Sequence, residues 1–500
     1  MESLEKSFGQ THFGNVDLGD LRRNRRLPEL VDCIVRKPGG TLPSMLPREA
    51  DADAFYRLCD ADDVTHAAVF AAHRSLVLKK LQKTRKNLLV IHDTTELDFS
   101  SRTSLKNLGQ IGNGGCRGYL AHNSLVVDAD HGQVLGLANQ ILHTRVERPK
   151  NELVAEHRAR QSRESLLWLR GTEGLPQRSQ VVDVCDRGAD TFEFLEHELR
   201  SQRSFVIRSA HNRVVSLGHE GKLSKPLSLY RHLRSLPAQA KSQTTVRIPS
   251  ELLEKRRRAK SKNSAKQIGN FREAKLCISF AAVRIHAPHV HRGNHGDEPL
   301  AVWAIRVWEP NPPPGCPRLE WFLLTNVPVE TSAAAKRVIR WYEWRWVIEE
   351  YHKGQKTGCG IEKLQFRDQA RLEPAIAILS IVAITLLQLR DAARHPNAHT
   401  RRADELVDPD AIQVLSLWKN NEPHPDWTVH EYYIALAELG GYRRRKDCPP
   451  GWQVLWRGYI ALNQMLEGYR LGRSLNGKAA KTTTKRCAKS SELRAQSSEL

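Results

Sequence analysis

The chain has 500 residues, which suggests roughly three domains of about 150 residues each. It carries 77 Lys and Arg against 56 Asp and Glu, a formal net charge of +21. A basic excess of this size favours a polyanionic partner, because each neutralised phosphate releases counterions. The charge therefore predicts nucleic-acid binding, and a basic protein without such a partner is the alternative.

The cysteines and the apolar segments exclude other classes of protein. The nine cysteines are scattered, odd in number and without a CxxC pair, which argues against a disulfide framework or a structural zinc site and favours a reducing cytosol. The start, "MESLEKSFGQ", lacks the pattern of a signal peptide. The longest apolar run, Ala375 to Leu387, is shorter than the roughly 20 residues that span a bilayer. We expect a soluble cytoplasmic protein with no membrane partner, and a buried helix at this run.

Residues 1–75 predict a small helical domain. The segment "DLGDLRRNRRLPELVDCIVRK" starts with Asp17 as a plausible N-cap and stops before a Pro-Gly-Gly turn. Four basic side chains lie within five residues of this helix: Arg22, Arg23, Arg25 and Arg26. A helical domain with such a cluster suits DNA contact. A solvated basic face is the alternative.

Residues 76–395 predict an α/β domain. The apolar run in "KNLLVIHDTTELDF" predicts a buried strand with acids, including Asp93, at its C-terminal end. Two more strands follow at hairpin spacing. After a helical stretch, "SQVVDVCDRGAD" predicts another buried strand with Asp186 at its exit, and then a helix and the strand "SFVIRSA". Three antiparallel strands followed by a helix and further strands indicate a mixed sheet.

The remainder of the chain is less regular. Residues 211–317 predict a β-rich insertion with a basic, disordered or DNA-contacting loop at 255–275. Residues 396–473 predict a helical C-terminal domain, whose amphipathic last helix suits either a core or a subunit contact. The tail, 474–500, is basic and of low complexity, and we expect it to be disordered.

Three acids occupy comparable places: Asp93 and Asp186 at strand ends, and Glu349 on a late helix. Strand ends gather at one edge of an α/β sheet, where such sheets keep their sites. Three carboxylates can hold two hard divalent cations, one beside the attacking oxygen and one beside the leaving oxygen of a phosphoryl displacement. A surface charge or a helix cap is the alternative for any one of these acids.

The stretch "WYEWRWVIEEYHKGQKTGCG" predicts one continuous helix. At roughly 100° per residue, Glu350 lies at the margin of the stripe that contains Glu349. That stripe, about 80° wide, holds five side chains: Tyr342, Arg345, Glu349, Lys353 and Lys356. Arg suits bidentate phosphate contacts and Lys acts as a point charge. A surface helix with a Glu349–Lys353 ion pair is the alternative.

The spacing of Tyr342, Arg345, Glu349 and Lys356 resembles the Y-(2)-R-(3)-E-(6)-K signature of bacterial DDE transposases of the insertion-sequence-four family. The flanking sequence "RWVIEEYHKGQKTGCG" is most similar to the Tn-five (IS-fifty) transposase group. "HDTTELDF" and "VCDRGAD" resemble the first two catalytic motifs of the family. "FGNVDLGDLRRNRRL" and "DAFYRLCD" resemble its N-terminal DNA-binding domain, and "GWQVLWRGYIALNQMLEGY" resembles its C-terminal dimerisation segment.

The resemblance implies an α/β, ribonuclease-H-like catalytic core with a β-strand insertion, flanked by helical DNA-binding and dimerisation domains. It implies that Asp93, Asp186 and Glu349 bind two Mg²⁺ ions, for which Mn²⁺ is expected to substitute. The remaining DNA contacts are placed by the signature or by position: Tyr342, Arg345 and Lys356 on phosphates, Lys353 beside them, Trp321 against a flipped base, and Arg208 after "SFVI".

The activity implied is cut-and-paste transposition. The enzyme would nick transposon ends, form and open a hairpin, and transfer the 3′-OH ends into target DNA. The partners implied are double-stranded DNA, with terminal inverted repeats and a target, and a second copy of the chain in a synaptic homodimer. The host implied is a bacterium. The alternatives are a non-catalytic DNA-binding regulator and a ribonuclease-H-like nuclease without strand transfer.

Overall fold

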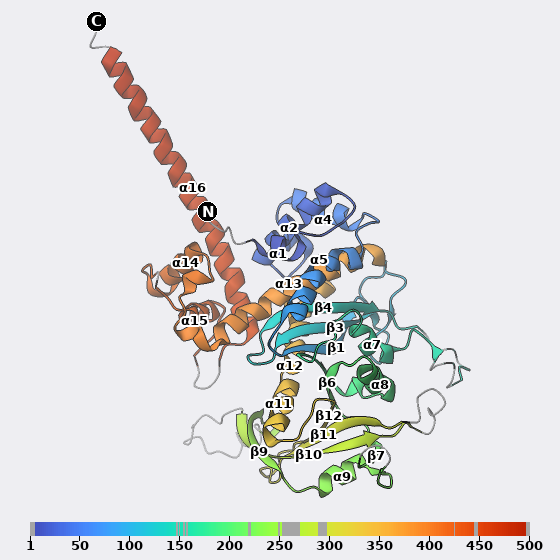
Figure 1. Ribbon diagram of the computed structural model, residues 1–500. Coiled ribbons are helices and arrows are strands. Elements are labelled where there is room, and N and C mark those ends of the chain that lie inside the picture. The colour runs from blue at the N-terminus through green and yellow to red at the C-terminus, as the bar shows by residue number, and fades with distance from the viewer. Residues whose placement is uncertain are drawn as a thin grey trace. The chain divides into compact units, whose positions relative to one another are not determined.

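The computed structural model describes residues 6–146, 149, 151–153, 156, 159–218, 222–248, 251–252, 271–288, 298–424, 426–444 and 449–496. The chain divides into two compact units, each described by itself (Figure 1). The sheet unit comprises residues 70–352 and 365–373, and the helical unit comprises residues 1–69, 353–364 and 374–500. Most of the basic loop predicted at 255–275 lies outside the described residues.

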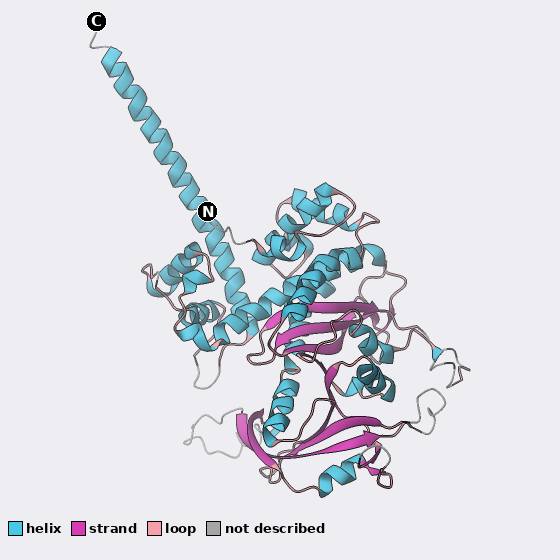
Figure 2. Ribbon diagram, in the orientation of Figure 1, coloured by secondary structure: helices cyan, strands magenta, loops and turns pink. Residues whose placement is uncertain are grey.

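The sheet unit is built on one mixed sheet (Figure 2). Its described strands are β1 (Leu88–Asp98), β2 (Gly109–Gln110), β3 (Arg117–Asp128), β4 (Val134–His143), β5 (Val181–Cys185), β6 (Ser204–Arg208), β7 (Val214–Ser216), β8 (Leu227–Ser228), β9 (Ala240–Arg247), β10 (Phe271–Ile285), β11 (Leu300–Trp308) and β12 (Glu320–Thr325). The order is β2-β3-β1-β5-β6-β12-β11-β10-β7-β8, with β4 on β3 and β9 on β10.

The strands β4, β3, β1, β5 and β6 form the part of the sheet that the sequence predicted. β1 pairs antiparallel with β3 over its whole length and parallel with β5 only as far as His92 and Cys185. β5 in turn pairs parallel with β6. The prediction that Asp93 ends its strand is wrong, because pairing with β3 carries β1 on to Asp98. Asp93 instead lies where the parallel ladder ends.

The strands of the predicted insertion, β7 to β11, extend the same sheet instead of forming a separate module. β11 pairs with β12, and β12 pairs with β6 from Leu323↔Arg208 to Thr325↔Val206. A buried apolar cluster runs from Cys185 and Phe205 to Val302 and Ala304, so the insertion shares its core with the predicted strands. β6 is therefore an interior strand, paired with β5 on one side and with β12 on the other.

Helices cover both faces of the sheet. Their bounds are α5 (His66–Lys83), η1 (Glu164–Leu166), α7 (Leu167–Gly171), η2 (Arg187–Ala189), α8 (Phe192–Arg200), α9 (Leu229–Ser235), α11 (Ser332–Glu343) and α12 (Trp346–Lys353). Leu88 and Val90 of β1 pack with Val77 and Leu81 of α5. Because side chains alternate along a strand, Asp93 points to the opposite face, towards α11 and α12.

The predicted continuous helix from Trp341 to Gly360 is interrupted. α11 ends at Glu343 and α12 begins at Trp346, with a turn at Trp344 and Arg345 between them. The Trp344 indole donates to the carbonyl of Ala129 at 3.0 Å, and its ring fills the space over Gly132. This distant anchor accounts for the break, which a helical wheel cannot anticipate. After α12, Gly354–Gly358 forms a π-helical turn.

The helical unit contains α1 (Phe8–Phe13), α2 (Leu21–Arg36), α3 (Leu42–Met45), α4 (Glu49–Cys59), α13 (Gln369–Arg394), α14 (Pro409–Asn420), α15 (Val429–Leu439) and α16 (Trp452–Gln496), with 3-10 turns at Ile361–Lys363, Pro396–His399 and Ala403–Glu405. α5 and α13 each cross from one unit into the other. The N-terminal and C-terminal helices are grouped together, and Asn463 donates to the carbonyl of Arg36 at 2.8 Å. The domain boundaries predicted from the sequence stay predictions.

Two features of the helical unit bear on earlier expectations. α16 continues through Ser474 to Gln496, where the sequence predicted a disordered tail; that segment has no proline and is rich in the helix formers Ala, Lys and Arg. By length and hydropathy α13 could cross a membrane, but 78% of its most apolar window is buried. Residues Ala375 to Leu387 are nearly all buried, which confirms the predicted buried helix.

Candidate active site

Three neighbouring strands align polar residues in one row. The parallel ladder across β1, β5 and β6 pairs His92 with Cys185 and Cys185 with Ile207. The residue after each member of this ladder is one that the sequence singled out: Asp93, Asp186 and Arg208. Asp186 accepts a hydrogen bond from the Gly188 amide at 2.8 Å, which fixes its carboxyl at the end of β5. Strand register thus brings two acids and one base together from three segments of the chain.

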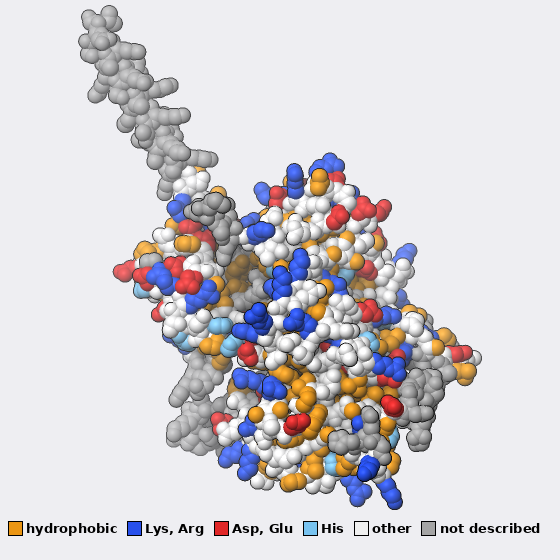
Figure 3. Space-filling model, viewed as in Figure 1, with side chains coloured by type: hydrophobic (Ala, Val, Ile, Leu, Met, Phe, Trp, Pro, Cys, Tyr) orange, Lys and Arg blue, Asp and Glu red, His pale blue; other side chains and the backbone are white. Residues whose placement is uncertain are grey.

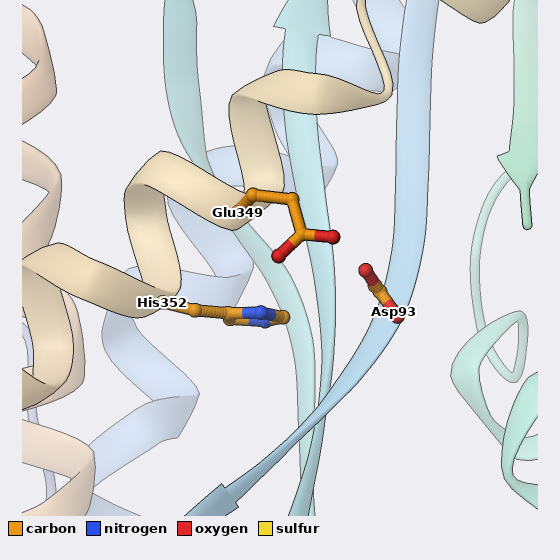
Figure 4. Close-up of side chains that lie close together, drawn as sticks. All are labelled: Asp93, Glu349 and His352. Atoms are coloured by element: carbon orange, nitrogen blue, oxygen red, sulfur yellow. The ribbon is translucent and has the colours of Figure 1, made fainter. Parts of the chain in front are cut away.

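Glu349 approaches this row from α12. Figure 4 shows its carboxylate facing that of Asp93. The Nη1 atom of Arg345 lies 3.2 Å from Asp93 Oδ2 and 3.4 Å from Glu349 Oε1, so one guanidinium bridges the two carboxylates. The ion pair that the structure shows for Glu349 is therefore with Arg345, whereas the surface-helix alternative expected one with Lys353. Despite the break before α12, the predicted Arg345 and Glu349 meet at Asp93.

Negative charge is in excess at Asp93. Burial raises the pKa of Asp93, the charge of Asp186 raises it further, and Arg345 only partly opposes them, so that the pKa is about 7. The Thr94 amide donates to Asp93 Oδ1 at 2.8 Å and also lowers the pKa. A group of carboxyls with too little positive charge is what a divalent cation neutralises.

His352 is a site residue that sequence reasoning missed. Asp93, Glu349 and His352 each offer a ligand atom, and the three atoms lie within 4.8 Å of one another (Figure 4). Asp186 is not part of this closest group, although its charge acts on Asp93. The available signal was the spacing E-x-x-H in "EEYH", because residues three apart share a helical face.

Tyr342 and Arg208 lie at the other end of the row. Burial raises the pKa of the Tyr342 phenol, while Arg345 and then Arg208 lower it through their charges and Arg208 also through a hydrogen bond. Trp321 is two residues from Leu323, the β12 partner of Arg208, and so lies on the same face of the sheet. Its indole Nε1 is buried without a hydrogen-bond partner in the described structure.

The remaining predicted lysines are not part of this row in the sheet unit. Lys353 is the last residue of α12 and Lys356 lies in the π-helical turn, at the start of a segment that belongs to the helical unit. The structure thus brings together five of the predicted residues: Asp93, Asp186, Arg208, Arg345 and Glu349. Tyr342 lies beside Arg208, and Trp321 lies on the same face of the sheet.

A buried polar network supports the row from the other face of the sheet. His92 Nε2 lies 2.8 Å from Asp183 Oδ1, and Arg203 Nε donates to Asp183 Oδ2 at 2.8 Å. Ser124 connects His92 to the carbonyl of Gly171. By linking His92 of β1 to Asp183 of β5, this network fixes the two strands relative to each other. His92 lies directly before Asp93, and Asp183 lies three residues before Asp186.

Two family models match the chain. A transposase DNA-binding model matches residues 5–64, and a transposase DDE domain model matches residues 156–386. The chain is a DDE transposase. As such it is a DNA-cleaving and strand-transferring enzyme, and its mixed sheet is the ribonuclease-H-like core that the sequence predicted.

The matched DDE segment contains Asp186 and Glu349 but begins after Asp93. For this transposase, Asp93 is therefore tied to the other two acids by strand register and by Arg345. Among solved structures, a piggyBac transposase synaptic complex with hairpin DNA, solved by cryo-EM, is similar at 9% identity over 89% of this chain and 71% of that chain, with a TM-score of 0.33. A likeness of that size assigns neither fold nor function.

The arginines of α2 in the transposase divide into two kinds. Arg23 and Arg26 are partly buried and face acids of the same unit, Arg23 with Asp63 and Arg26 with Glu29 and Asp51. Arg22 is exposed and pairs with Asp20, the N-cap of α2. Arg25 is exposed. Within the cluster, Arg22 and Arg25 are thus the side chains best placed to meet phosphates from solvent.

We expect Arg25→Ala and Arg26→Ala to have different effects. Arg25→Ala should weaken DNA binding and lower the slope of log affinity against log salt by about 1, because one phosphate contact is lost. Arg26→Ala should instead lower the stability of residues 6–69 by roughly 1–3 kcal/mol, because Asp51 is buried and, of its two ion pairs among the described residues, would keep the one with Arg48. Fluorescence anisotropy at several salt concentrations and urea titration measure the two. Equal salt slopes for Arg25→Ala and the unaltered protein would contradict the assignment.

Proposed function

We propose that the transposase carries out cut-and-paste transposition in the manner of the insertion-sequence-four family, and of the Tn-five group within it. The observation that carries this proposal is the row of Asp93, Asp186 and Arg208, with Glu349 and Arg345 over it. This row combines carboxylates that can bind cations with arginines that can bind phosphate. Phosphoryl transfer requires little else from a protein than such positioning and charge.

The residues of this row fit a divalent-cation cofactor. Asp93, Asp186 and Glu349 offer the oxygen ligands that Mg²⁺ takes, and their charge exceeds that of Arg345. When bound, two Mg²⁺ ions, for which Mn²⁺ is expected to substitute, supply the charge that activates the attacking oxygen and stabilises the leaving oxygen. Asp93 neighbours Asp186 on one side and Glu349 on the other, so these three carboxylates together would hold the cations.

The basic and aromatic residues would hold the DNA strand. Arg345 and Arg208 suit bidentate contacts to phosphate oxygens, and Tyr342 would donate a further hydrogen bond. Lys353 and Lys356 would add point charges at the end of α12. Trp321 offers a ring on which a flipped base can stack, and its buried Nε1 lacks a partner within the described residues.

Each chemical step would exchange one oxygen for another at phosphorus. In the nick, water attacks a phosphodiester at the transposon end and its 3′ oxygen leaves, so that the segment on the 5′ side of the break ends in a free 3′-OH and the segment on the 3′ side keeps the 5′-phosphate. This 3′-OH then attacks the opposite strand to form a hairpin, and water opens the hairpin. Finally the 3′-OH attacks a target phosphodiester, whose own 3′ oxygen leaves. One row of residues can serve all the steps because attacking and leaving oxygens have the same chemistry.

The partners of the reaction would be double-stranded DNA and a second copy of the chain. The DNA would carry the terminal inverted repeats and the target, and residues 5–64 match a DNA-binding model. Figure 3 shows Lys and Arg side chains spread over the viewed face, as the net charge of +21 predicts. In the same proposal, the homodimer would form through a C-terminal region that includes α16. The location would be the bacterial cytoplasm.

The test is an assay of the protein on DNA that ends in the inverted repeats flanking its own coding region. We expect Mg²⁺-dependent nicks at the repeat ends, then hairpins, then joining to a supercoiled target. Cleavage without joining would favour the nuclease alternative. Binding without cleavage would favour the non-catalytic regulator. Cleavage elsewhere than the repeat ends would contradict the proposal altogether.

A further inference from the structure

Asp190 closes the short turn that follows β5 in the transposase. It lies four residues after Asp186, and its amide donates to the carbonyl of Arg187 at 3.2 Å. Its side chain is fully buried. A buried carboxylate is costly unless it is paired and hydrogen-bonded. The partners of this carboxylate, which is not one of the three acids of the catalytic row, therefore indicate what it does.

These partners lie in the segment directly after β6. Oδ2 of the carboxylate accepts from the amides of Ala210 and His211, at 2.6 and 3.0 Å, and from the Ser209 hydroxyl at 3.2 Å. Oδ1 accepts from Nε and Nη2 of Arg213, at 3.0 and 2.6 Å. Hydrogen bonds to an ionised carboxylate are stronger than those between neutral groups. One buried side chain thus ties the exit of β5 to the exit of β6.

Arg208 is the residue directly before this segment. Its guanidinium hydrogen-bonds Tyr342, and its Nε is buried with no hydrogen-bond partner in the described structure. Because Tyr342 is itself a side chain of the site, the direction of Arg208 depends on the backbone that carries it. That backbone pairs with Leu323 of β12 and continues into the segment that Asp190 holds.

We propose that Asp190 is a positioning residue, which holds Arg208 in line with Asp186 so that both face the same phosphate. The inference rests on the proposed function, in which Arg208 contacts phosphate. The carboxylate is needed because it accepts on both oxygens, whereas Asn has one acceptor and an NH₂ group that would face either the amides or Arg213. A misplacement of about 1 Å at such a site can cost a hundredfold in rate.

The competing role for Asp190 is support of the fold alone. In that case its loss would slow cleavage no more than the loss of a comparable buried ion pair. Glu309 provides the comparison, because it is buried in the same unit and its carboxylate accepts from Arg272 at 2.6 and 2.9 Å. That pair joins β10 to the residue after β11.

The experiment measures single-turnover cleavage of DNA that ends in the terminal inverted repeats, in Mg²⁺ and over a range of full-length protein concentrations. We expect Asp190→Asn to lower the maximal rate by about tenfold or more. The protein concentration at half-maximal rate should change by less than about threefold, because the variant affects positioning more than binding. Glu309→Gln should change both quantities by less than about threefold. Urea titration shows whether each variant is folded.

A cycle of double variants with Arg208→Ala separates positioning from general damage. If Asp190 acts through Arg208, Asp190→Asn should slow cleavage by less than about twofold once Arg208 is absent, because coupled changes are not additive. Ser209→Ala guards against a loss of fold, since it removes one hydrogen bond of Asp190 and keeps the ion pair. It should slow cleavage by about threefold, again only while Arg208 is present.

Equal slowing by Asp190→Asn with and without Arg208, or by Asp190→Asn and Glu309→Gln, would overturn the inference and leave the proposed function intact. If Asp190→Asn does not fold, Ser209→Ala decides, and an unchanged rate would overturn the inference. If Arg208→Ala cleaved at the unaltered rate, the proposed phosphate contact of Arg208 would fail and the inference with it. Absence of cleavage by the unaltered protein would instead refute the proposed function.

Discussion

Glu349→Gln is expected to lower the rate of strand cleavage at transposon ends by roughly a thousandfold, whereas Glu350→Gln should retain activity within about threefold. Glu349 faces Asp93 across Arg345. Glu350 is the next residue on α12, about 100° around the helix, and therefore points elsewhere. The two substitutions are chemically identical and neighbours in sequence, so only their direction distinguishes them.

The measurement is single-turnover cleavage of labelled end DNA in Mg²⁺, with gel shifts to compare binding. Glu349→Gln should bind end DNA at least as well as the unaltered protein, because it removes one negative charge near the phosphates. Equal activity of the two variants would show that the face of α12 is assigned wrongly.

Arg203→Met should destabilise the sheet unit by roughly 3–5 kcal/mol, the cost of leaving a buried charge without its partner. The Arg203 side chain is 4% exposed and bonds Asp183, which is fully buried in β5. Burial would raise the pKa of Asp183, but Arg203 and His92 hold it below its usual value. The methylene stem of Met fills similar space, so the loss is mainly electrostatic.

Arg200→Met is the matched control for Arg203→Met. Arg200 pairs with Glu196 at the surface, with 69% of its side chain exposed, and its loss should cost no more than about 1 kcal/mol. Urea titration of both variants compares them. A double variant with Asp183→Asn should be less unstable than the sum of the two single changes, because no unpaired charge remains. Similar costs for Arg203→Met and Arg200→Met would contradict the network.

The ion pair of Asp183 and Arg203 makes the free energy of unfolding depend on pH. Because the pKa of Asp183 is lowered from 3.8 in the folded protein, its contribution is fully present above that value. The contribution is lost as the pH falls through the folded pKa. Burial, together with the charge of Asp183, raises the pKa of the nearby Glu198, so Glu198 acts with the opposite sign and favours the folded state at lower pH.

The sequence predicted the strands of the core because their signals are local. β1, β5 and β6 are each marked by a short apolar run, and these runs are buried as expected. Asp93 and Asp186 were found because each follows such a run. Their alignment was not predictable, since it depends on pairing His92 with Cys185, a register that no local pattern encodes.

The α11–α12 region shows how tertiary contacts override a helical pattern. The wheel assigned Glu349 and Arg345 to one face, and both do meet Asp93. It could not anticipate the turn at Trp344 and Arg345, because Trp344 is anchored by Ala129, more than two hundred residues away. His352 was missed for a related reason: its importance appears only when β1 and β3 place Asp93 and Asn123 beside it.

The central claim is that Asp93, Asp186 and Glu349 form one catalytic site for cutting and joining DNA. The most direct measurement compares the unaltered transposase with Asp186→Asn on paired-end DNA and a supercoiled target in Mg²⁺. We predict that the unaltered protein yields nicked, hairpin and joined products. Asp186→Asn should shift the same DNA in a gel but yield none of them. Cleavage or joining by Asp186→Asn at a rate close to that of the unaltered protein would contradict the claim.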